Sequence, residues 1–183
     1  MARRTPPPPL DGPSLERLAL RYVERFATTR GKLSDYLRRK VRERGWEGAS
    51  ADADALAERM AMLGYVDDRA FAEAKATALT RRGLGGRRVS VALRQAKVGE
   101  EDAATVRPMV EASAADSALG FARRKRIGPF AEAVADRPKR EKQLAQMVRA
   151  GHAFAISRRI VDAAPGEESD LGELNRCGGD EAC

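Results

Sequence analysis

The chain has 183 residues, of which 33% are charged and only 5% are aromatic. So few aromatic side chains argue against one large core and favour several small cores of Leu, Val, Met and Ala. No apolar run approaches the ~20 residues that span a bilayer, and the first residues lack the apolar segment of a secretory signal. We therefore expect a cytoplasmic protein without a membrane segment.

The positive charge is concentrated before residue 165. The chain has 34 Lys and Arg against 27 Asp and Glu, but residues 165–183 contain six acids and one base, so residues 1–164 carry a net charge of +12. A charge of this size favours a polyanionic partner, which can be nucleic acid, an acidic protein surface, or an assembly of both. A solvated Arg-rich surface without a binding role is the alternative.

Both ends of the chain are predicted to be disordered. Pro6–Pro9 is a run of four prolines that cannot begin a core, so residues 1–13 are interpreted as a Pro-rich arm. Residues 165–183 are acidic, contain glycine and have no hydrophobic period, which is typical of a disordered tail. Cys177 and Cys183 both lie in that tail, where a reducing compartment and the lack of His neighbours argue against a disulfide or a zinc site.

The first folded segment is predicted to contain three helices. Apolar residues recur at spacings of three and four near residues 14–28, 33–44 and 51–63. Arg30-Gly31 and the segment from Gly45 to Gly48 interrupt this pattern, so we expect chain breaks there. Together the three helices form a first unit over residues 14–66.

The unit then recurs along the chain. A shift of 52 positions places Leu37 on Val89 and Val41 on Leu93, and a third, looser copy has helices near 115–126 and 153–163. Self-similarity at a period near 50 residues is typical of stacked helical units. The predicted fold is therefore all-α: a tandem array of three three-helix repeats over residues 14–66, 67–114 and 115–164, elongated and curved.

The segment that joins the first two units is predicted to be structural. Gly64 can adopt the left-handed conformation that ends a helix, and Tyr65 and Val66 then return the chain to the core. Asp67 or Asp68 can accept hydrogen bonds from the free amides of the next helix. Phe71 is expected to start the buried face of that helix.

No residue pattern indicates catalysis. His152 is the single histidine, at a helix boundary, and we interpret it as a structural or surface residue. The glycine-rich segment from Arg82 to Arg87 lacks both a preceding strand and the Lys-Ser or Lys-Thr of a phosphate loop. We therefore expect no enzyme activity, no metal site and no cofactor.

Basic residues recur at matching places in the three units, and arginine suits both carboxylate and phosphate partners. Residues 81–97 contain six bases and no acid. Few aromatic residues are placed for base stacking, which predicts weak readout of single strands. The candidate binding residues are Arg38, Arg39, Arg42, Arg81, Arg82, Arg87, Arg88, Arg94, Lys97, Arg123, Arg124 and Arg140.

The order and content of these motifs resemble those of the RecX family over about residues 15–163. Gly64-Tyr65-Val66-Asp67-Asp68 with Phe71-Ala72 resembles the most characteristic stretch of the family, and the Arg-rich segments 37–46 and 91–98 are similar to its second helices. Segments 127–130 and 144–152 look like its third unit. The chain departs from the family at Lys97, where Gly is frequent, and at His152, where an aromatic or aliphatic residue is usual; a polar ring there would weaken packing or lie at the surface.

The resemblance implies a monomeric regulator of recombination, DNA repair and the SOS response. Such a protein lies in the groove of the filament that RecA forms on single-stranded DNA, limits filament growth, and lowers strand exchange, ATP turnover and repressor co-cleavage. The candidate basic residues would then face acidic RecA surface, DNA phosphates, or both. Two alternatives remain open: a basic helical module that binds nucleic acid independently of RecA, and an adaptor for another protein.

Overall fold

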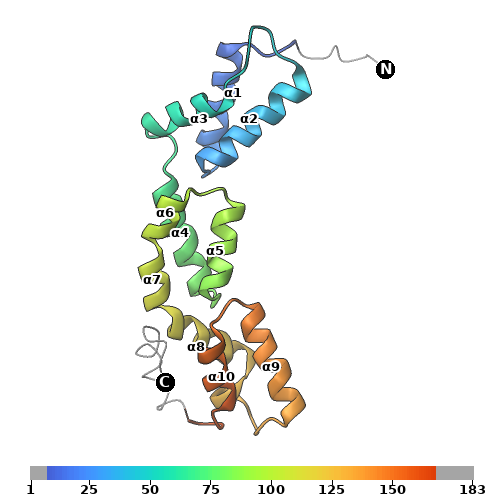
Figure 1. Cartoon of the computed structure of the whole chain (residues 1–183), viewed down its shortest axis with the longest axis vertical. Helices are drawn as coiled ribbons and strands as arrows, with labels where there is room; N and C mark the ends of the chain where they lie inside the picture. The colour runs from blue at the N-terminus through green and yellow to red at the C-terminus, as the bar shows by residue number, and fades with distance from the viewer. Residues whose placement is uncertain (1–7, 168–183) are drawn as a thin grey trace, which may run out of the picture. The chain divides into compact units, whose positions relative to one another are not determined.

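The computed structural model describes residues 8–167, and its regular structure is helical (Figure 1). Within that range no strand forms, and Leu10 and Trp46 make an isolated bridge, so the predicted all-α class is confirmed. No helix of the described part is long and apolar enough to cross a bilayer. Residues 1–7 and 168–183, which include both cysteines, lie outside the described residues. The helices are α1 (Gly12–Arg25), α2 (Arg30–Arg44), α3 (Ala53–Met62), α4 (Asp68–Arg81), α5 (Gly86–Gln95), α6 (Glu100–Thr105), α7 (Arg107–Ala112), α8 (Ala114–Lys125), the 3-10 helix η1 (Gly128–Phe130), α9 (Arg137–Arg149) and α10 (Phe154–Asp162).

The described chain divides into two compact units. Unit 1 contains residues 8–71 and 94–102, and unit 2 contains residues 72–93 and 103–167. The chain passes between the units within α4, α5 and α6, so residues of the predicted second repeat are shared between them. The array of three repeats with boundaries at 66 and 114 stays a prediction.

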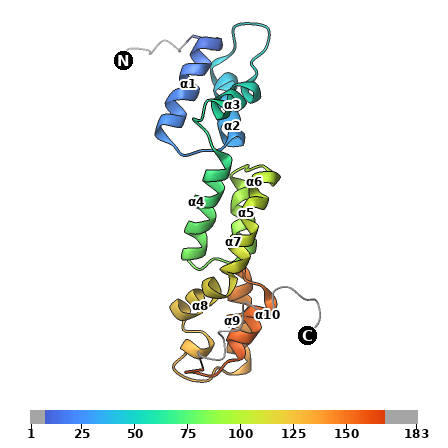
Figure 2. The ribbon, with the colours of Figure 1, turned by 90° about the vertical axis from the view of Figure 1, so that its left-hand side faces the viewer.

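Unit 1 is built on α1, α2 and α3, which pack against one another (Figure 2). Leu33 and Leu37 of α2 lie one helical turn apart and are fully buried, together with Met60 of α3. Leu15 and Ala19 of α1 complete this small core. The four-residue spacing from which these helices were predicted places their apolar side chains on one helix face.

Each of the three helices begins at a side chain that accepts a hydrogen bond from the backbone three residues later. Asp11 accepts from the amide of Ser14 at 2.9 Å, and Asp52 accepts from that of Ala55 at 2.9 Å. Thr29 does the same for α2, so this helix begins at Arg30. The predicted break at Arg30-Gly31 is therefore wrong, because both residues belong to the first turn of α2.

Leu10 corrects the predicted extent of the N-terminal arm. Its side chain is fully buried in the core of unit 1. Its amide donates to the Gly45 carbonyl at 3.0 Å, and its carbonyl accepts from the amide of Glu47 at 2.8 Å. These contacts order the chain before Gly12, within the 1–13 segment that the prolines had marked as disordered.

The joint after α3 has the predicted backbone. Gly64 is left-handed, with φ of 78°, and the Tyr65 amide donates back to the Met60 carbonyl at 2.9 Å, which is the hydrogen bond that closes such a helix end. Asp67 is the residue that caps α4, because its carboxylate accepts from the Ala70 amide at 2.8 Å.

Two side chains of the joint differ from expectation. Tyr65 is 53% exposed, so of the two residues expected to return the chain to the core only Val66 is buried. Phe71 is half-buried, whereas Ala72 and Ala76 are fully buried. The inward face of α4 is therefore lined by small residues, which allow close approach of a neighbouring backbone, rather than by the Phe71 ring.

Asp68 has a separate role inside unit 1. Its side chain is 4% exposed and accepts from the Arg30 backbone amide at 2.8 Å and from the Arg30 Nε at 3.3 Å. The same guanidinium also pairs with Glu58 at 3.2 Å and with Asp102 at 3.1 Å. Arg30 therefore links the start of α2 to α3, α4 and α6.

The start of α2 contacts the residues that follow α5. The Thr29 hydroxyl donates to the Ala96 carbonyl at 2.5 Å. A Cβ on Gly31 would lie 2.5 Å from the Lys97 Cβ, so only glycine fits this approach. Lys97 itself is left-handed, with φ of 57°. Lys97 thus ends α5 in the conformation that glycine usually supplies, although it is not glycine.

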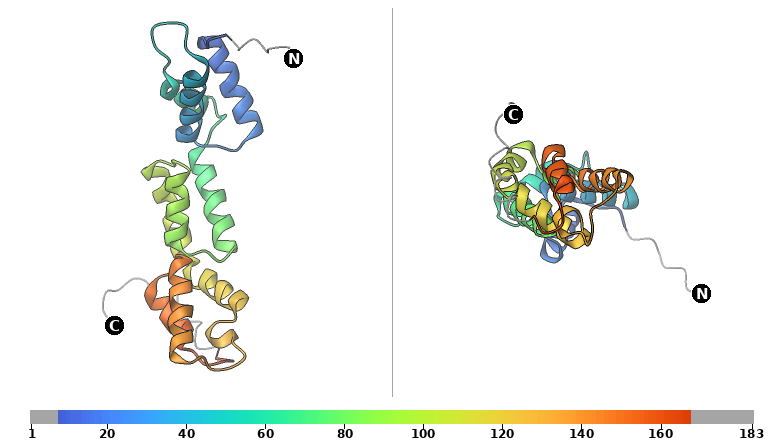
Figure 3. Two further views of the ribbon diagram at one scale, coloured as in Figure 1. Left: turned by 90° about the vertical axis from the view of Figure 1, so that its right-hand side faces the viewer. Right: turned by 90° about the horizontal axis from the view of Figure 1, so that it is seen from below.

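Unit 2 has its core between α8, α9, α10 and η1, which contact one another (Figure 3). The fully buried residues there include Ala118 and Ala122 of α8, Met147 of α9 and Ile160 of α10, with Ile127 between α8 and η1. The predicted helices near 115–126 and 153–163 correspond to α8 and α10. The third helix of the predicted second repeat is instead divided into α6 and α7.

Gly85 and Gly151 make a second close backbone contact, inside unit 2. The Gly85 amide donates to the Ala150 carbonyl at 3.0 Å, and the Arg87 amide donates to the Gly151 carbonyl at 3.2 Å. A Cβ on Gly85 would lie 2.3 Å from the Gly151 carbonyl carbon. Gly85 lies 54 positions after Gly31, and left-handed Gly151 lies 54 positions after left-handed Lys97. The same local joint therefore forms twice.

Candidate functional site

All twelve predicted binding residues have exposed side chains, but their electrostatic surroundings differ. A guanidinium that already contacts a carboxylate must give up that partner, or share it, when it binds another anion. The ion pairs of each unit therefore separate the candidates into neutralised and available cations.

In unit 1 three of the five candidates are neutralised. Arg38 pairs with Asp54, Arg39 pairs with Glu43 at 3.6 Å, and Lys97 pairs with Asp35 at 2.7 Å. The pKa of the Asp54 carboxyl lies below its usual value, first because the Ser34 hydroxyl donates to it and then because of Arg38. The other two candidates, Arg42 and Arg94, make no ion pair with any described residue.

In unit 2 the Arg-rich segment before and within α5 keeps its charge. Arg81, Arg82 and Arg87 make no ion pair with any described residue. The Arg88 Nε donates to the Arg149 carbonyl at 2.8 Å, and a carbonyl leaves the guanidinium charge in place. Four exposed positive charges therefore lie within eight residues of one another in the chain.

Two further candidates of unit 2 are held locally. The Arg123 guanidinium lies 4.9 Å from the centre of the Phe130 ring. Arg140 is 3.9 Å from Asp162, at the outer limit of an ion pair.

Arg124, the last candidate of unit 2, donates to the Arg82 carbonyl, which brings a cation of α8 beside the segment that precedes α5. The structure thus adds Arg124 and Arg149 to the neighbourhood of residues 81–88.

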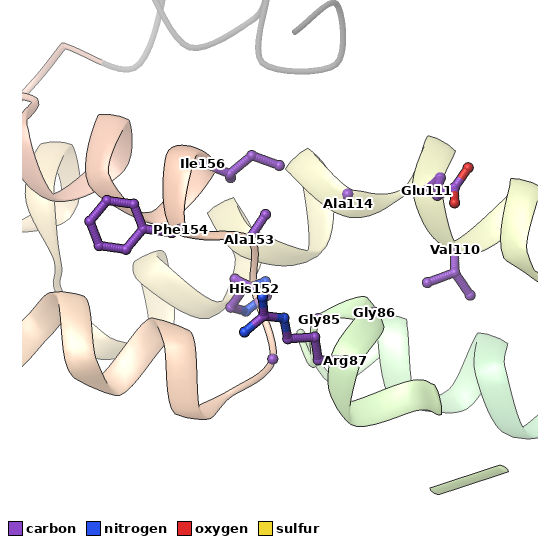
Figure 4. Close-up of a pocket in the computed structure, with 11 residues that line it drawn as sticks. Gly85, Gly86, Arg87, Val110, Glu111, Ala114, His152, Ala153, Phe154 and Ile156 are labelled. Atoms are coloured by element: carbon purple, nitrogen blue, oxygen red, sulfur yellow. The ribbon is translucent and has the colours of Figure 1, made fainter. Parts of the chain in front are cut away.

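A cavity of about 270 Å³ opens beside the start of α5 (Figure 4). Gly85, Gly86 and Arg87 line one side, and the turn before α10 lines another. Phe154, which is 56% exposed, lies at its edge. Glu111 also lines the cavity, so its surface carries both charges. This cavity could not be predicted from the sequence, because its walls come from three separate stretches of the chain.

His152 lines that cavity and is buried, contrary to the surface position considered from the sequence. Its ring lies 5.4 Å from the Phe121 ring. Burial lowers the pKa of His152; a hydrogen bond to the Gly83 backbone opposes this shift, and the charge of Arg124 adds to it. The ring is therefore neutral near pH 7 and packs as an aromatic side chain, which is the residue type usual at this position of the resembled family.

The described residues contain no group of three or more His, Cys, Asp or Glu side chains that could hold a metal ion. Asp67 and Asp68, the adjacent acids of the joint, have separate partners: Asp67 caps α4 and Asp68 binds Arg30.

Comparison with known proteins identifies relatives that match more than four fifths of the chain, although no family model matches it. The regulatory protein RecX of Myxococcus xanthus is 34% identical over 160 residues, which cover 82% of this chain and 86% of that protein. The regulatory protein RecX of Agrobacterium fabrum is 26% identical over 157 residues, with 84% of each chain covered.

Two solved structures share the fold. The crystal structure of RecX from Lactobacillus salivarius matches with a TM-score of 0.63 at 15% identity, covering 80% of this chain and 92% of that one. A second RecX crystal structure matches with a TM-score of 0.58 at 19% identity, covering 82% and 73% of the two chains.

Proposed function

The chain belongs to the RecX family of regulatory proteins, and from this premise we propose that it binds the RecA filament on single-stranded DNA and inhibits its recombinase, ATPase and co-protease activities. The family predicted from residues 64–72 is thus confirmed. The proposed activity is regulatory, requires no cofactor and takes place in the cytoplasm.

The observation that supports a binding surface is the charge of residues 81–88. Arg81, Arg82 and Arg87 are exposed and make no ion pair with any described residue, and the Arg88 guanidinium donates to the Arg149 carbonyl, which carries no charge. These arginines can therefore form charge-assisted hydrogen bonds with an acidic partner without first breaking an internal ion pair. We therefore assign the first contact with the filament to these residues rather than to Arg38, Arg39 or Lys97.

The experiment measures ATP hydrolysis by RecA on single-stranded DNA as the purified protein is added. Wild-type protein should inhibit hydrolysis at or below one molecule per RecA protomer. Reversal of all four arginines, Arg81, Arg82, Arg87 and Arg88, to Glu should preserve helicity by circular dichroism and raise the concentration for half-inhibition at least about tenfold, which corresponds to about 1.4 kcal/mol. Absence of inhibition by the wild-type protein would contradict the proposal.

A charge-matched control separates this surface from net charge. It reverses four exposed arginines that already have a partner within their own unit and that are not binding candidates: Arg17, Arg126, Arg137 and Arg158. Exposed ion pairs contribute about 0–1 kcal/mol each, so the control should remain folded. If the control variant loses RecA inhibition as fully as the first variant, the loss is caused by the change in net charge and not by residues 81–88.

The second candidate function is nucleic-acid binding that acts without RecA. Binding carried by phosphate contacts weakens with salt, with a slope of about −0.7 per contacted phosphate on a single strand. Tight DNA binding that persists at high salt in the absence of RecA, together with no effect on RecA ATPase, would favour this alternative.

A further inference from the structure

Three aromatic rings gather on the side of unit 1 formed by α1 and α2. Tyr22 and Tyr36 stack with ring centres 4.2 Å apart and an interplanar angle of 21°. Phe26, which follows the last residue of α1, lies 5.3 Å from the Tyr22 ring. The two tyrosines are half-buried against the core of unit 1, whereas Phe26 is 52% exposed. We call this row of rings the aromatic row.

Positive charges flank the aromatic row. The Arg25 guanidinium lies 5.8 Å from the centre of the Phe26 ring. Arg39 and Lys40 lie 5.6 Å and 5.8 Å from the centre of the Tyr36 ring. Residues 21–44 contain nine bases and three acids. Cations at these distances are attracted to ring faces, and they also attract phosphates.

The acids near the row neutralise the cations at its Tyr36 end but not those at its Phe26 end. Glu43 pairs with both Arg39 and Lys40, and Asp35 pairs with Lys97. Arg21 and Arg25 make no ion pair with any described residue, and the remaining acid of the segment, at position 24, is exposed. The Phe26 end of the row is therefore the more positive end, and it is also the end with an exposed ring.

Packing accounts for the two tyrosines but not for Phe26. The tyrosines cover the core, as half-buried aromatic residues commonly do. A phenylalanine with half of its surface in water contributes little to folding. Its ring is tilted by 48° to the Tyr22 ring and keeps exposed surface on which a further planar group can stack. A nucleobase is such a group, because each base has a π-face and carries a phosphate that an arginine can bind.

We propose that the aromatic row, with Arg25 at its Phe26 end, is a stacking site for the bases of single-stranded nucleic acid. One base stacks on the exposed Phe26 ring, and a neighbouring phosphate binds Arg25. Duplex DNA does not fit this mode, because its bases are already stacked on one another. The proposal does not depend on filament regulation, and its experiments contain no RecA.

The first experiment measures binding of fluorescein-labelled oligo-dT and oligo-rU to the full-length protein by fluorescence anisotropy. Phe26→Leu keeps apolar volume but removes the ring, and it should weaken binding about 5- to 100-fold, which is the loss expected for one base stack. Phe26→Trp should retain or tighten binding. Phe154→Leu, which changes an equally exposed ring in unit 2, should bind as the wild type does.

Salt dependence separates stacking from charge. Phe26→Leu should leave the slope of log affinity against log salt unchanged, because no phosphate contact is lost. Arg25→Gln should reduce that slope by about 0.7, the value for one phosphate contact on a single strand. Comparison of oligo-dT with oligo-rU decides whether DNA or RNA is the preferred source of the bases.

The second experiment locates the contact. Photo-crosslinking with oligonucleotides that carry 5-iodouracil, followed by peptide mass spectrometry, should place the crosslink on Tyr22 or Phe26. Wild-type affinity of Phe26→Leu, crosslinks only outside residues 21–44, or no binding of single strands by the wild-type protein would each overturn the proposal. If Phe26→Leu weakens binding to a partner protein but leaves oligonucleotide binding unchanged, the proposal is also overturned, because the aromatic row would then be a protein interface.

Discussion

Substitution of Gly85 by alanine tests the backbone joint between α5 and the turn before α10. The Gly85 backbone is not left-handed, so alanine is not excluded by φ, and the effect comes from space alone. The new Cβ would lie 2.3 Å from the carbonyl carbon and oxygen of Gly151 and 2.4 Å from the His152 amide nitrogen. These are backbone atoms, so no side-chain rotation can relieve the overlap.

The loss of stability in Gly85→Ala can be estimated from the contacts that change when the segments around Gly85 and Gly151 separate. Separation of the two segments lengthens the Gly85–Ala150 and Arg87–Gly151 hydrogen bonds, each worth about 1 kcal/mol. Overpacking of a tight contact adds about 1–3 kcal/mol. The free energy of unfolding should therefore fall by about 2–5 kcal/mol.

The measurement is urea denaturation followed by circular dichroism, with hydrogen exchange to locate the change. With a denaturant slope of about 1–3 kcal/mol per molar, the midpoint should fall by about 1 M or more. Exchange should increase in residues 85–95 and 143–152. Gly12→Ala is the control, because nothing lies within 4 Å of the Cβ it adds. If Gly85→Ala shifts the midpoint no more than Gly12→Ala does, the joint is not a close contact in solution.

Two further predictions concern buried polar groups. Burial lowers the pKa of His152 below 6.5, so the unfolded chain takes up the proton more readily; the stability from neutral His152 is complete above about pH 6.5 and declines as pH falls below it. In thermal melts His152→Gln should therefore lose less stability than the wild type between about pH 7.5 and pH 5.5, and an equal loss would refute the assignment. Asp68→Ala leaves the Arg30 amide without its side-chain acceptor and should cost about 1–3 kcal/mol in urea denaturation. Glu58→Gln, at an exposed partner of the same arginine, should cost far less; equal losses would contradict the role given to Asp68.

Local features of this protein were predictable because they depend on residues close in the sequence. A helix aligns side chains three and four positions apart, so the apolar period predicted α1, α2 and α3 to within a few residues at most ends. Gly64 ends α3 for a reason that lies in glycine itself, since it has no Cβ to oppose a positive φ. The family resemblance rests on these same local motifs.

Features that join distant residues were not predictable in this way. Gly31 looked like a break, yet it lies in the first turn of α2, and glycine is required there because a Cβ would overlap Lys97. His152 was open to a structural or a surface role, and its burial beside Phe121 decides for the structural one. In each case the deciding neighbour is more than 30 positions away in the chain.

The proposed binding surface likewise depends partly on local sequence and partly on the tertiary structure. The sequence by itself determined that the chain is basic, helical and built from small apolar residues, because composition and periodicity are sums over local choices. Only the tertiary structure decided which charges remain available, because Arg38 meets Asp54 and Lys97 meets Asp35 through folding, whereas Arg81 and Arg87 meet no acid among the described residues. The tertiary structure likewise gathered scattered aromatic residues into one row, since ring stacking depends on how α1 packs against α2 and not on the spacing within either helix.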